Sequence, residues 1–196
     1  MNNFFDQEII LEDSLVRLEP LQPEHFEALL PVAMHNDLWA FTINKIHSKE
    51  DFKQYFNTAL EEKQAKKSYP FALYDKQHQE YAGSTRFLNI DLKHKRLEIG
   101  STWITPRLHG SGFNKHCKFL LLHYCFENLQ LNRVELKTSL LNLRSQKAML
   151  NIGAVKEGVF RRHMINDDGS LRDSVYFSFI KDDWPGIKTS IFKAFI

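Results

Sequence analysis

The chain has 196 residues, 43% of them hydrophobic, which is enough for one substantial core and too short to require two domains. Its 26 lysines and arginines against 24 acidic residues leave a formal net charge of +2, unlike the strongly basic character of sequence-independent nucleic-acid binders. We therefore expect a single domain over residues 1–196, with a core at about 15–184, and no direct nucleic-acid partner.

The cysteines and the N-terminus say where such a protein would work. Cys117 and Cys125 stand eight residues apart in one apolar segment, which matches neither a zinc-ligand spacing nor a disulfide framework. Both are expected to be buried thiols in a reducing compartment. The first ten residues, MNNFFDQEII, lack a basic flank before an apolar run, and no stretch is long and apolar enough for a bilayer. These features predict a cytoplasmic protein without membrane contact.

The first half of the chain alternates between strand and helix patterns. Ser48, followed three residues later by Asp51, resembles a capping box before a segment with helical apolar spacing. Polar turns separate the last three strand-like runs, which predicts an antiparallel meander. In chain order the predicted elements are a strand at 15–21, helices at 23–35 and 51–67, and strands at 70–75, 81–90 and 97–105.

The second half begins with the stretch RLHGSGFNK at 107–115 and contains no internal repeat, low-complexity segment or flexible linker. The whole order of elements predicts an α/β (α+β) fold. The predicted elements here are a helix at 114–129, a strand at 133–140, a helix at 142–153, and strands at 155–165 and 173–180 joined by a turn at 167–169.

Gly110 and Gly112 lie between a predicted strand and a long predicted helix. Backbone amides at a helix start lack intrahelical partners and carry partial positive charge, so they attract anions. Glycine lets the backbone approach phosphate oxygens and adopt a positive φ. A pyrophosphate would suit such a loop, although the spacing is neither a Walker loop nor the dinucleotide fingerprint. A tight turn with no ligand explains the two glycines equally well.

The order of motifs around this loop favours the ligand-binding interpretation over a simple turn. Arg107, Gly110 and Gly112 fill an R/Q-x-x-G-x-G/A motif that follows a strand with a carboxylate and precedes a helix, a strand and an Asn-started helix. Over about residues 15–184 the chain resembles the GNAT superfamily of acyl-coenzyme A-dependent N-acyltransferases. It is most similar to the RimJ/RimL-like branch, which includes ribosomal-protein N-terminal acetyltransferases, in LEIGSTWI (97–104), NLRSQKAMLNIGA (142–154) and RDSVYFS (172–178).

The resemblance implies a GNAT-like mixed, mostly antiparallel central sheet flanked by helices, with splayed central strands at 97–105 and 133–140 that form an acyl-CoA cleft. Coenzyme A would place its pyrophosphate on the amides of about 107–114 and its pantetheine arm on backbone groups of 103–105. Lys115 and Lys118 are near enough to help the phosphates, but we interpret them as solvated lysines. The implied cofactor-binding residues are Trp103, Ile104, Thr105, Arg107, Gly110, Ser111, Gly112, Phe113, Asn114 and Asn142.

Glu98 occupies the position at which many relatives carry a carboxylate that acts as a base, directly or through water. A base must reach the amine by hydrogen bond, and a partly apolar wall would raise its pKa toward neutrality. The alternative is a structural salt bridge from Glu98 to Arg86 or Arg96. The candidate wall residues are Phe87, Leu97 and Trp103.

Asn142 corresponds to the family asparagine that contacts the coenzyme arm, and it would also cap a helix without any ligand. The family often has a tyrosine seven residues later, positioned as an acid toward sulfur, where this chain has Met149. That departure directs attention to Ser145, in the first helical turn, as a second catalytic candidate. Its other role would be to solvate the helix N-terminus.

Other residues carry less weight. No carboxylate or cysteine completes a metal set with the histidines, so we expect no metal. The basic runs at 93–96 and 161–163 could attract an acidic partner, but such runs more often mark solvated turns and strand edges. Phe41, Phe52 and Phe56 lie in the helical region that roofs the acceptor cleft in relatives. The histidines weighed are His109, His116 and His123.

The sequence therefore predicts an N-acetyltransferase that uses acetyl-CoA to acetylate a primary amine by direct attack in a ternary complex. The acceptor, a peptide or protein N-terminus or a small molecule, is left open, as is a homodimer. One alternative is a non-catalytic acyl-CoA-binding or sensing protein, which Met149 favours and Glu98 disfavours. The other is a partner-binding domain without coenzyme, which the glycine pair disfavours.

Overall fold

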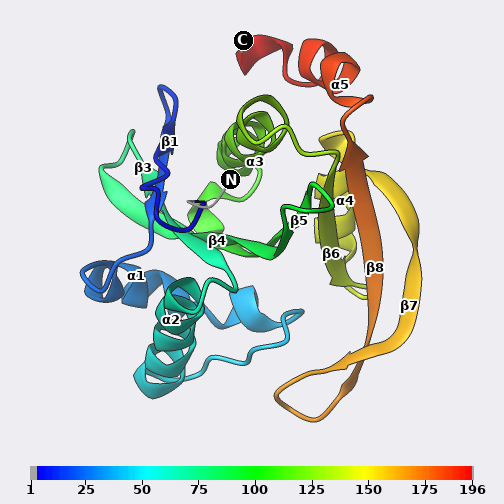
Figure 1. The fold of residues 1–196 in the computed structure, drawn as a ribbon. Helices are drawn as coiled ribbons and strands as arrows, with labels where there is room; N and C mark the ends of the chain where they lie inside the picture. The colour runs from blue at the N-terminus through cyan, green and yellow to red at the C-terminus, as the bar shows by residue number, and fades with distance from the viewer. Residues whose placement is uncertain (1–3, 196) are drawn as a thin grey trace.

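The computed structural model describes residues 4–195, built around one eight-stranded sheet in the order β1-β2-β3-β4-β5-β6-β8-β7 (Figure 1). Neighbouring strands are antiparallel except β5 and β6, which are parallel. This confirms the predicted mixed, mostly antiparallel sheet. The strands are β1 (Leu11–Glu12), β2 (Val16–Pro20), β3 (Tyr69–Asp75), β4 (Glu80–Asp91), β5 (Arg96–Ile104), β6 (Arg133–Ser139), β7 (Val155–Ile165) and β8 (Leu171–Ile180).

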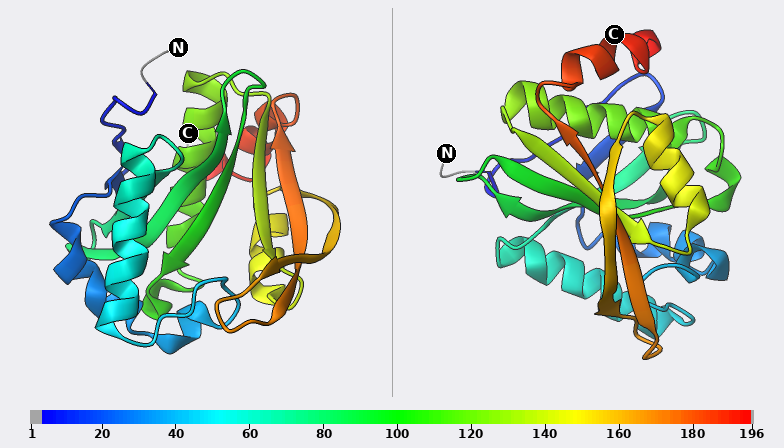
Figure 2. Two further views of the ribbon diagram at one scale, coloured as in Figure 1. Left: turned by 60° about the horizontal axis from the view of Figure 1, so that its bottom comes forward. Right: turned by 90° about the vertical axis from the view of Figure 1, so that its right-hand side faces the viewer.

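Helices cover both faces of the sheet (Figures 1 and 2). On one face lie α1 (His25–Ala33) and α2 (Lys49–Gln64), and on the other lie α3 (Phe113–His123) and α4 (Leu143–Asn151). The short α5 (Trp184–Ser190) packs beside α3. None of the helices formed by residues 4–195 combines the length and the apolar character that crossing a membrane requires.

Two hydrophobic clusters fill the space between the sheet and its helices. The larger contains Leu97, Ile99 and the apolar face of α3, and the smaller contains Trp103 with residues of α1 and α2. The split follows from the two-residue period of a strand, which sends neighbouring side chains to opposite faces. Each strand residue is therefore assigned either to the α3 side or to the α1/α2 side.

The predicted elements are present, with differences at their ends. The capping box is confirmed, because Ser48 Oγ accepts from the Asp51 amide at 3.1 Å and Asp51 accepts from the Ser48 amide at 3.0 Å. The predicted helix 114–129 is α-helical over Phe113–His123 and continues as a π-helical turn at 124–128. Elements that were not predicted are β1, α5, and 3-10 turns at Asn36–Trp39, Pro106–Leu108 and Lys193–Phe195.

The two central strands separate after a short paired region. β5 and β6 pair only where residues 96–98 face 133–135. Further along β5, Arg86 faces Gly100 and Ser84 faces Trp103, so β5 holds one extra residue in a bulge. Ser101 lies in this bulge with φ +47°. Bulges bend a strand and increase its twist, and here the bend accompanies the divergence of β5 from β6.

Candidate active site

Glu98 lies where β5 and β6 begin to separate. The residue is only 1% exposed, and its Oε2 accepts hydrogen bonds from Asn89 Nδ2 and Lys137 Nζ, both at 2.9 Å. Lys137 comes from β6, so this ion pair joins the two diverging strands. A buried charge is tolerated when it is paired and hydrogen-bonded in this way.

The second carboxylate oxygen of Glu98 lies over Gly100. A Cβ at Gly100 would stand 2.8 Å from Glu98 Oε1 and 2.9 Å from Leu88 Cδ1, so only glycine leaves room for the carboxylate. Within residues 4–195, Oε1 accepts no hydrogen bond. One oxygen of Glu98 is thus held by two donors, and the other has no hydrogen-bond partner among the described residues.

The alternative salt bridge for Glu98 is wrong in its partners. Arg86 Nη1 binds Glu62 at 3.2 Å, and Arg96 binds Asp91 and Glu135. The partner of Glu98 is a lysine on β6, which was not considered because strand pairing cannot be read from chain order alone.

The expected apolar wall is also wrong for Phe87 and Leu97. Both belong to the hydrophobic cluster on the α3 side of the sheet. Glu98 points to the opposite side, because neighbouring residues of a strand alternate between the two faces. Trp103 belongs to the cluster on the α1/α2 side, where its Nε1 donates to Tyr55 at 3.2 Å.

The glycine loop, defined here as residues 106–112, joins β5 to α3. Gly110 has φ +79° and Gly112 has φ +93°, and a Cβ at either would meet no atom within 4 Å. Within residues 4–195, the amides of Gly110, Gly112 and Asn114 donate no backbone hydrogen bond outside the regular elements. Open space and unpaired donors at a helix N-terminus are the features of an anion site.

Other predicted loop residues use their polar groups internally. The Ser111 hydroxyl donates to Leu108 O at 2.8 Å and accepts from the Phe113 amide at 3.2 Å. The Thr105 amide donates to Ala82 O at 2.7 Å.

Arg107 is neutralised by acidic side chains. Its Nη2 lies 3.3 Å from Asp75 Oδ2 and also contacts Glu80. On the other side of the glycine loop, Arg144 of α4 donates from Nη1 to His109 Nδ1 at 3.1 Å. His109 Nε2 in turn donates to Ile104 O at 3.0 Å. Burial, and after it the Arg144 guanidinium, lower the pKa of His109. Arg144 is therefore a cation paired with a neutral ring, at the side of the cleft opposite β5.

The start of α4 has the predicted cap. Asn142 Oδ1 accepts from the Ser145 amide at 3.0 Å, which confirms Asn142 as N-cap. Among the described residues, the Ser145 hydroxyl donates no hydrogen bond. Met149 is partly buried against the larger core cluster.

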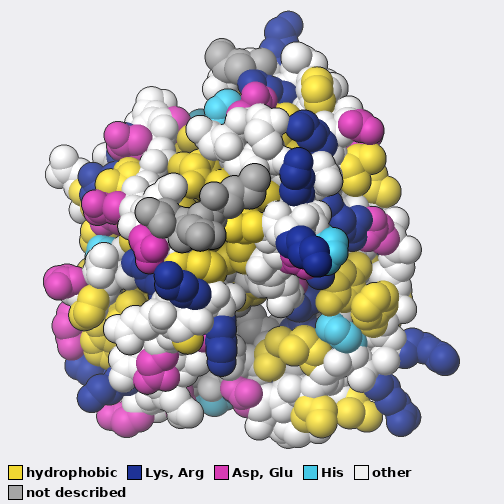
Figure 3. Space-filling model, viewed as in Figure 1, with side chains coloured by type: hydrophobic (Ala, Val, Ile, Leu, Met, Phe, Trp, Pro, Cys, Tyr) yellow, Lys and Arg dark blue, Asp and Glu magenta, His cyan; other side chains and the backbone are white. Residues whose placement is uncertain are grey.

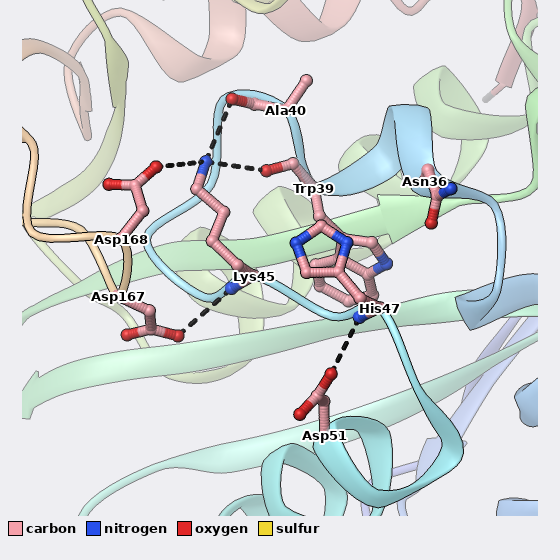
Figure 4. Close-up of a pocket in the computed structure, with 8 residues that line it drawn as sticks. All are labelled: Asn36, Trp39, Ala40, Lys45, His47, Asp51, Asp167 and Asp168. Atoms are coloured by element: carbon pink, nitrogen blue, oxygen red, sulfur yellow. Dashed lines mark hydrogen bonds and ion pairs between the residues drawn. The ribbon is translucent and has the colours of Figure 1, made fainter.

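Two cavities adjoin this region. One of about 530 Å³ lies between the loop after α1, the start of α2 and the β7–β8 turn (Figure 4). In it Lys45 Nζ donates to Trp39 O at 3.1 Å and Ala40 O at 3.2 Å and lies 3.9 Å from Asp168. The other, of about 350 Å³, is lined by Asn89 and Tyr176, next to Glu98 and Lys137.

Their surroundings are mixed in charge. Figure 3 shows basic and acidic side chains interspersed over the face seen in Figure 1, with a hollow near its centre. Phe52 and Phe56 are buried on the inner side of α2, while Phe41 is 43% exposed, so of these three only Phe41 reaches solvent.

Several residues near the site were missed or misjudged. Lys137 and Asn89 hold Glu98, and only the sheet register reveals them. The prediction that Lys118 is solvated is wrong, because the residue is 6% exposed and its Nζ donates to Thr102 Oγ1 at 2.9 Å. The apolar residues around it in α3 were a signal, since Lys118 lies one residue from buried Cys117. Within residues 4–195, no three His, Cys, Asp or Glu side chains gather as metal ligands would.

Comparisons with known proteins agree with this geometry. The family model of the acetyltransferase (GNAT) domain matches residues 16–155. The N-acetyltransferase p20 of Bacillus licheniformis, itself uncharacterised, is 32% identical over 142 residues, 72% of this chain and 76% of that protein. A GCN5-related N-acetyltransferase from Brucella melitensis superposes with a TM-score of 0.87 at 26% identity, covering 95% of this chain and 85% of that one.

A candidate ribosomal N-acetyltransferase of Bacillus subtilis strain 168, YdaF, is 34% identical over 100 residues, which is 51% of this chain and spans only 54% of YdaF. The domain match covers most of the chain, and the central strands separate as an acyl-CoA cleft requires. The chain belongs to the GNAT family of acetyltransferases.

Proposed function

We propose that this protein transfers the acetyl group of acetyl-CoA to a primary amine by direct attack in a ternary complex. The observation that carries the proposal is Glu98, a buried carboxylate with one hydrogen-bonded oxygen and one available oxygen where β5 and β6 separate. The glycine loop at the far end of β5 supplies the anion site that a coenzyme needs.

The residues present fit coenzyme A. The amides of Gly110, Gly112 and Asn114 would hold the pyrophosphate, and Asn142 with backbone groups of 103 and 104 would hold the pantetheine arm, since the amide and carbonyl of Thr105 are both hydrogen-bonded within the chain. When bound, the coenzyme supplies an acetyl thioester, which is an acyl group activated toward amines. Because Arg107 is already paired with carboxylates, we assign the countercharge for the phosphates to Arg144.

Glu98 would act as the base. An acceptor amine is largely protonated at neutral pH and must lose a proton before it can attack. Glu98 Oε1 would take that proton directly or through one water, while Asn89 and Lys137 fix the other oxygen. As the C–N bond forms and the C–S bond breaks, the nitrogen would lose a second proton and the sulfur would gain one. Ser145 is the candidate to pass this proton, giving its own proton to sulfur and recovering one from the nitrogen through solvent.

The acceptor would approach from the α1/α2 side. Glu98 faces that side, and both cavities adjoin it. A protein or peptide N-terminus and a small amine are both acceptors under this proposal. The similarity to YdaF supports the N-terminus of a ribosomal protein as the first acceptor to test.

A second candidate function is acyl-CoA binding without turnover. The ion pair between Glu98 and Lys137 at 2.9 Å favours it, because such a pair can serve only to hold β5 and β6 together. Met149, at the place of the usual tyrosine, also favours it.

The test is to incubate the purified protein with acetyl-CoA and a panel of peptides and small amines, and to follow free thiol and product mass. The proposal expects a product heavier by one acetyl group and an equal amount of free coenzyme A. Binding of acetyl-CoA without thiol release on any acceptor would support the second candidate. No binding of acetyl-CoA would contradict both.

A further inference from the structure

Lys118 is a buried lysine without an acidic partner. It lies in α3, faces the sheet and is 6% exposed, and none of the ion pairs among residues 4–195 includes it. Lysine is almost never this buried unless paired. Burial lowers its pKa to about 8. Burying Lys118 therefore costs free energy of folding at neutral pH, and its contacts should explain why it is buried.

The contacts of Lys118 lead to the β5 bulge. Its Nζ donates to Thr102 Oγ1 at 2.9 Å. Thr102 Oγ1 lies 2.7 Å from Thr85 Oγ1, and Thr85 Oγ1 lies 3.4 Å from Gly100 O. This chain of contacts begins on α3, crosses β5 and β4, and returns to the residue over which Glu98 lies.

The bulge needs such support. Ser101 has φ +47°, a left-handed conformation that is unfavourable for a residue with a side chain. Strained backbone persists only where its surroundings define it strongly. The two residues beside Ser101, Gly100 and Thr102, are the ones that the Lys118 contacts hold.

We propose that Lys118 is a positioning residue, which fixes the β5 bulge through Thr102 and thereby sets the separation of β5 from β6 and the place of Glu98. The role in catalysis rests on the proposed function, but the role in fixing the bulge does not.

The test compares Lys118→Met and Thr102→Val with the wild-type protein. Amide hydrogen exchange at Ser101 and Thr102, followed by NMR without any ligand, is expected to quicken by about tenfold or more in each variant, which corresponds to ~1.4 kcal/mol. The turnover number kcat is expected to fall by a similar factor. The Kd for coenzyme A should change much less, because the glycine loop is untouched.

Two comparisons make the test specific. Thr102→Ser keeps the hydroxyl and is expected to retain slow amide exchange. The Lys118→Met, Thr102→Val double variant should exchange about as fast as either single variant, because both substitutions remove the same hydrogen bond. Lys115→Met is the control on the same helix, since Lys115 lies over the rings of Phe192 and Phe195.

Unchanged amide exchange in Thr102→Val, which preserves side-chain shape, would overturn the proposal even if Lys118→Met fails to fold. Altered exchange without any acetyl transfer by the wild-type protein would instead count against the proposed function alone. Additive effects in the double variant would also overturn the proposal.

Discussion

Glu98 and Gly100 face the same side of β5, and the missing side chain at 100 leaves space for the carboxylate. In Gly100→Ala the added Cβ would stand 2.8 Å from Glu98 Oε1, closer than such contacts allow. We expect the carboxylate to move and kcat to fall by about tenfold or more, with the Kd for acetyl-CoA nearly unchanged. Steady-state kinetics and calorimetry measure the two quantities.

The matched control for this variant is Gly186→Ala in α5, where a Cβ would meet no atom within 4 Å. If Gly100→Ala kept the wild-type kcat, the position of the Glu98 carboxylate would not matter for turnover.

Lys118 also predicts a pH dependence of stability. Burial lowers its pKa to about 8 from 10.5, so between these values the unfolded chain binds more protons than the folded one. Wild-type stability relative to Lys118→Met should therefore rise as the pH increases from about 8 to about 10.5. Neighbouring Cys117, whose pKa burial raises to about 12, stays protonated over this range.

Urea unfolding of both proteins at pH 7 and pH 10 measures this difference. A free-energy difference that stays constant between the two pH values would show that Lys118 titrates normally in the folded protein.

At the scale of elements, the glycine loop is the segment most directly tied to the coenzyme. Valine at 112 would be strained at φ +93° and would fill open space in front of the helix amides. We expect Gly112→Val to weaken coenzyme A binding by at least ~1.4 kcal/mol, a factor of ten, with the fold retained. Calorimetry checks this.

Gly169→Val is the matched control, because Gly169 has φ +80° and no atom within 4 Å of an added Cβ, but lies in the β7–β8 turn. Equal loss of coenzyme affinity in both variants, or no loss in Gly112→Val, would mean that the loop only makes a turn.

The two sides of the cleft supply different charges to the phosphates. Arg107 is held by Asp75 and Glu80, whereas Arg144 contacts only the neutral ring of His109 among its described hydrogen-bond partners. We expect Arg144→Gln to weaken coenzyme A binding more than Arg107→Gln, and to reduce the salt dependence of the Kd. Titrations at two salt concentrations test this, and a larger loss in Arg107→Gln would contradict it.

Sequence patterns predicted where helices and strands lie in the chain better than they predicted which elements pack against each other. The capping box at Ser48 agrees with the structure because it depends on the chemistry of four neighbouring residues, and the strand at 155–165 also has the predicted bounds. The π-helical turn at 124–128 was missed because its apolar spacing resembles that of an α-helix. Lys118 was misjudged because a lysine in a helical segment is solvated in most proteins, and only packing against β5 shows otherwise.

At the scale of the whole molecule, the site combines elements far apart in the sequence. The strand-to-helix loop and the positive φ of its glycines could be predicted because they depend on neighbouring residues, but the Asn89 and Lys137 contacts of Glu98 depend on strand register and a β4 irregularity. The loop after α1 is likewise joined to the β7–β8 hairpin, where the Asp167 amide donates to Ile43 O at 3.0 Å and Arg172 Nη1 donates to Phe41 O at 2.9 Å. Such long-range contacts have no sequence signature.

The central claim is that Glu98 acts as the base for acetyl transfer. The most direct measurement compares kcat and the acetyl-CoA Kd of the wild-type protein and Glu98→Gln across pH, with an acceptor identified in the panel. The account predicts a loss of about 10²-fold or more in kcat at neutral pH, a smaller loss at high pH, where free amine is abundant, and a nearly unchanged Kd. A Glu98→Gln variant that keeps wild-type turnover at every pH would contradict it.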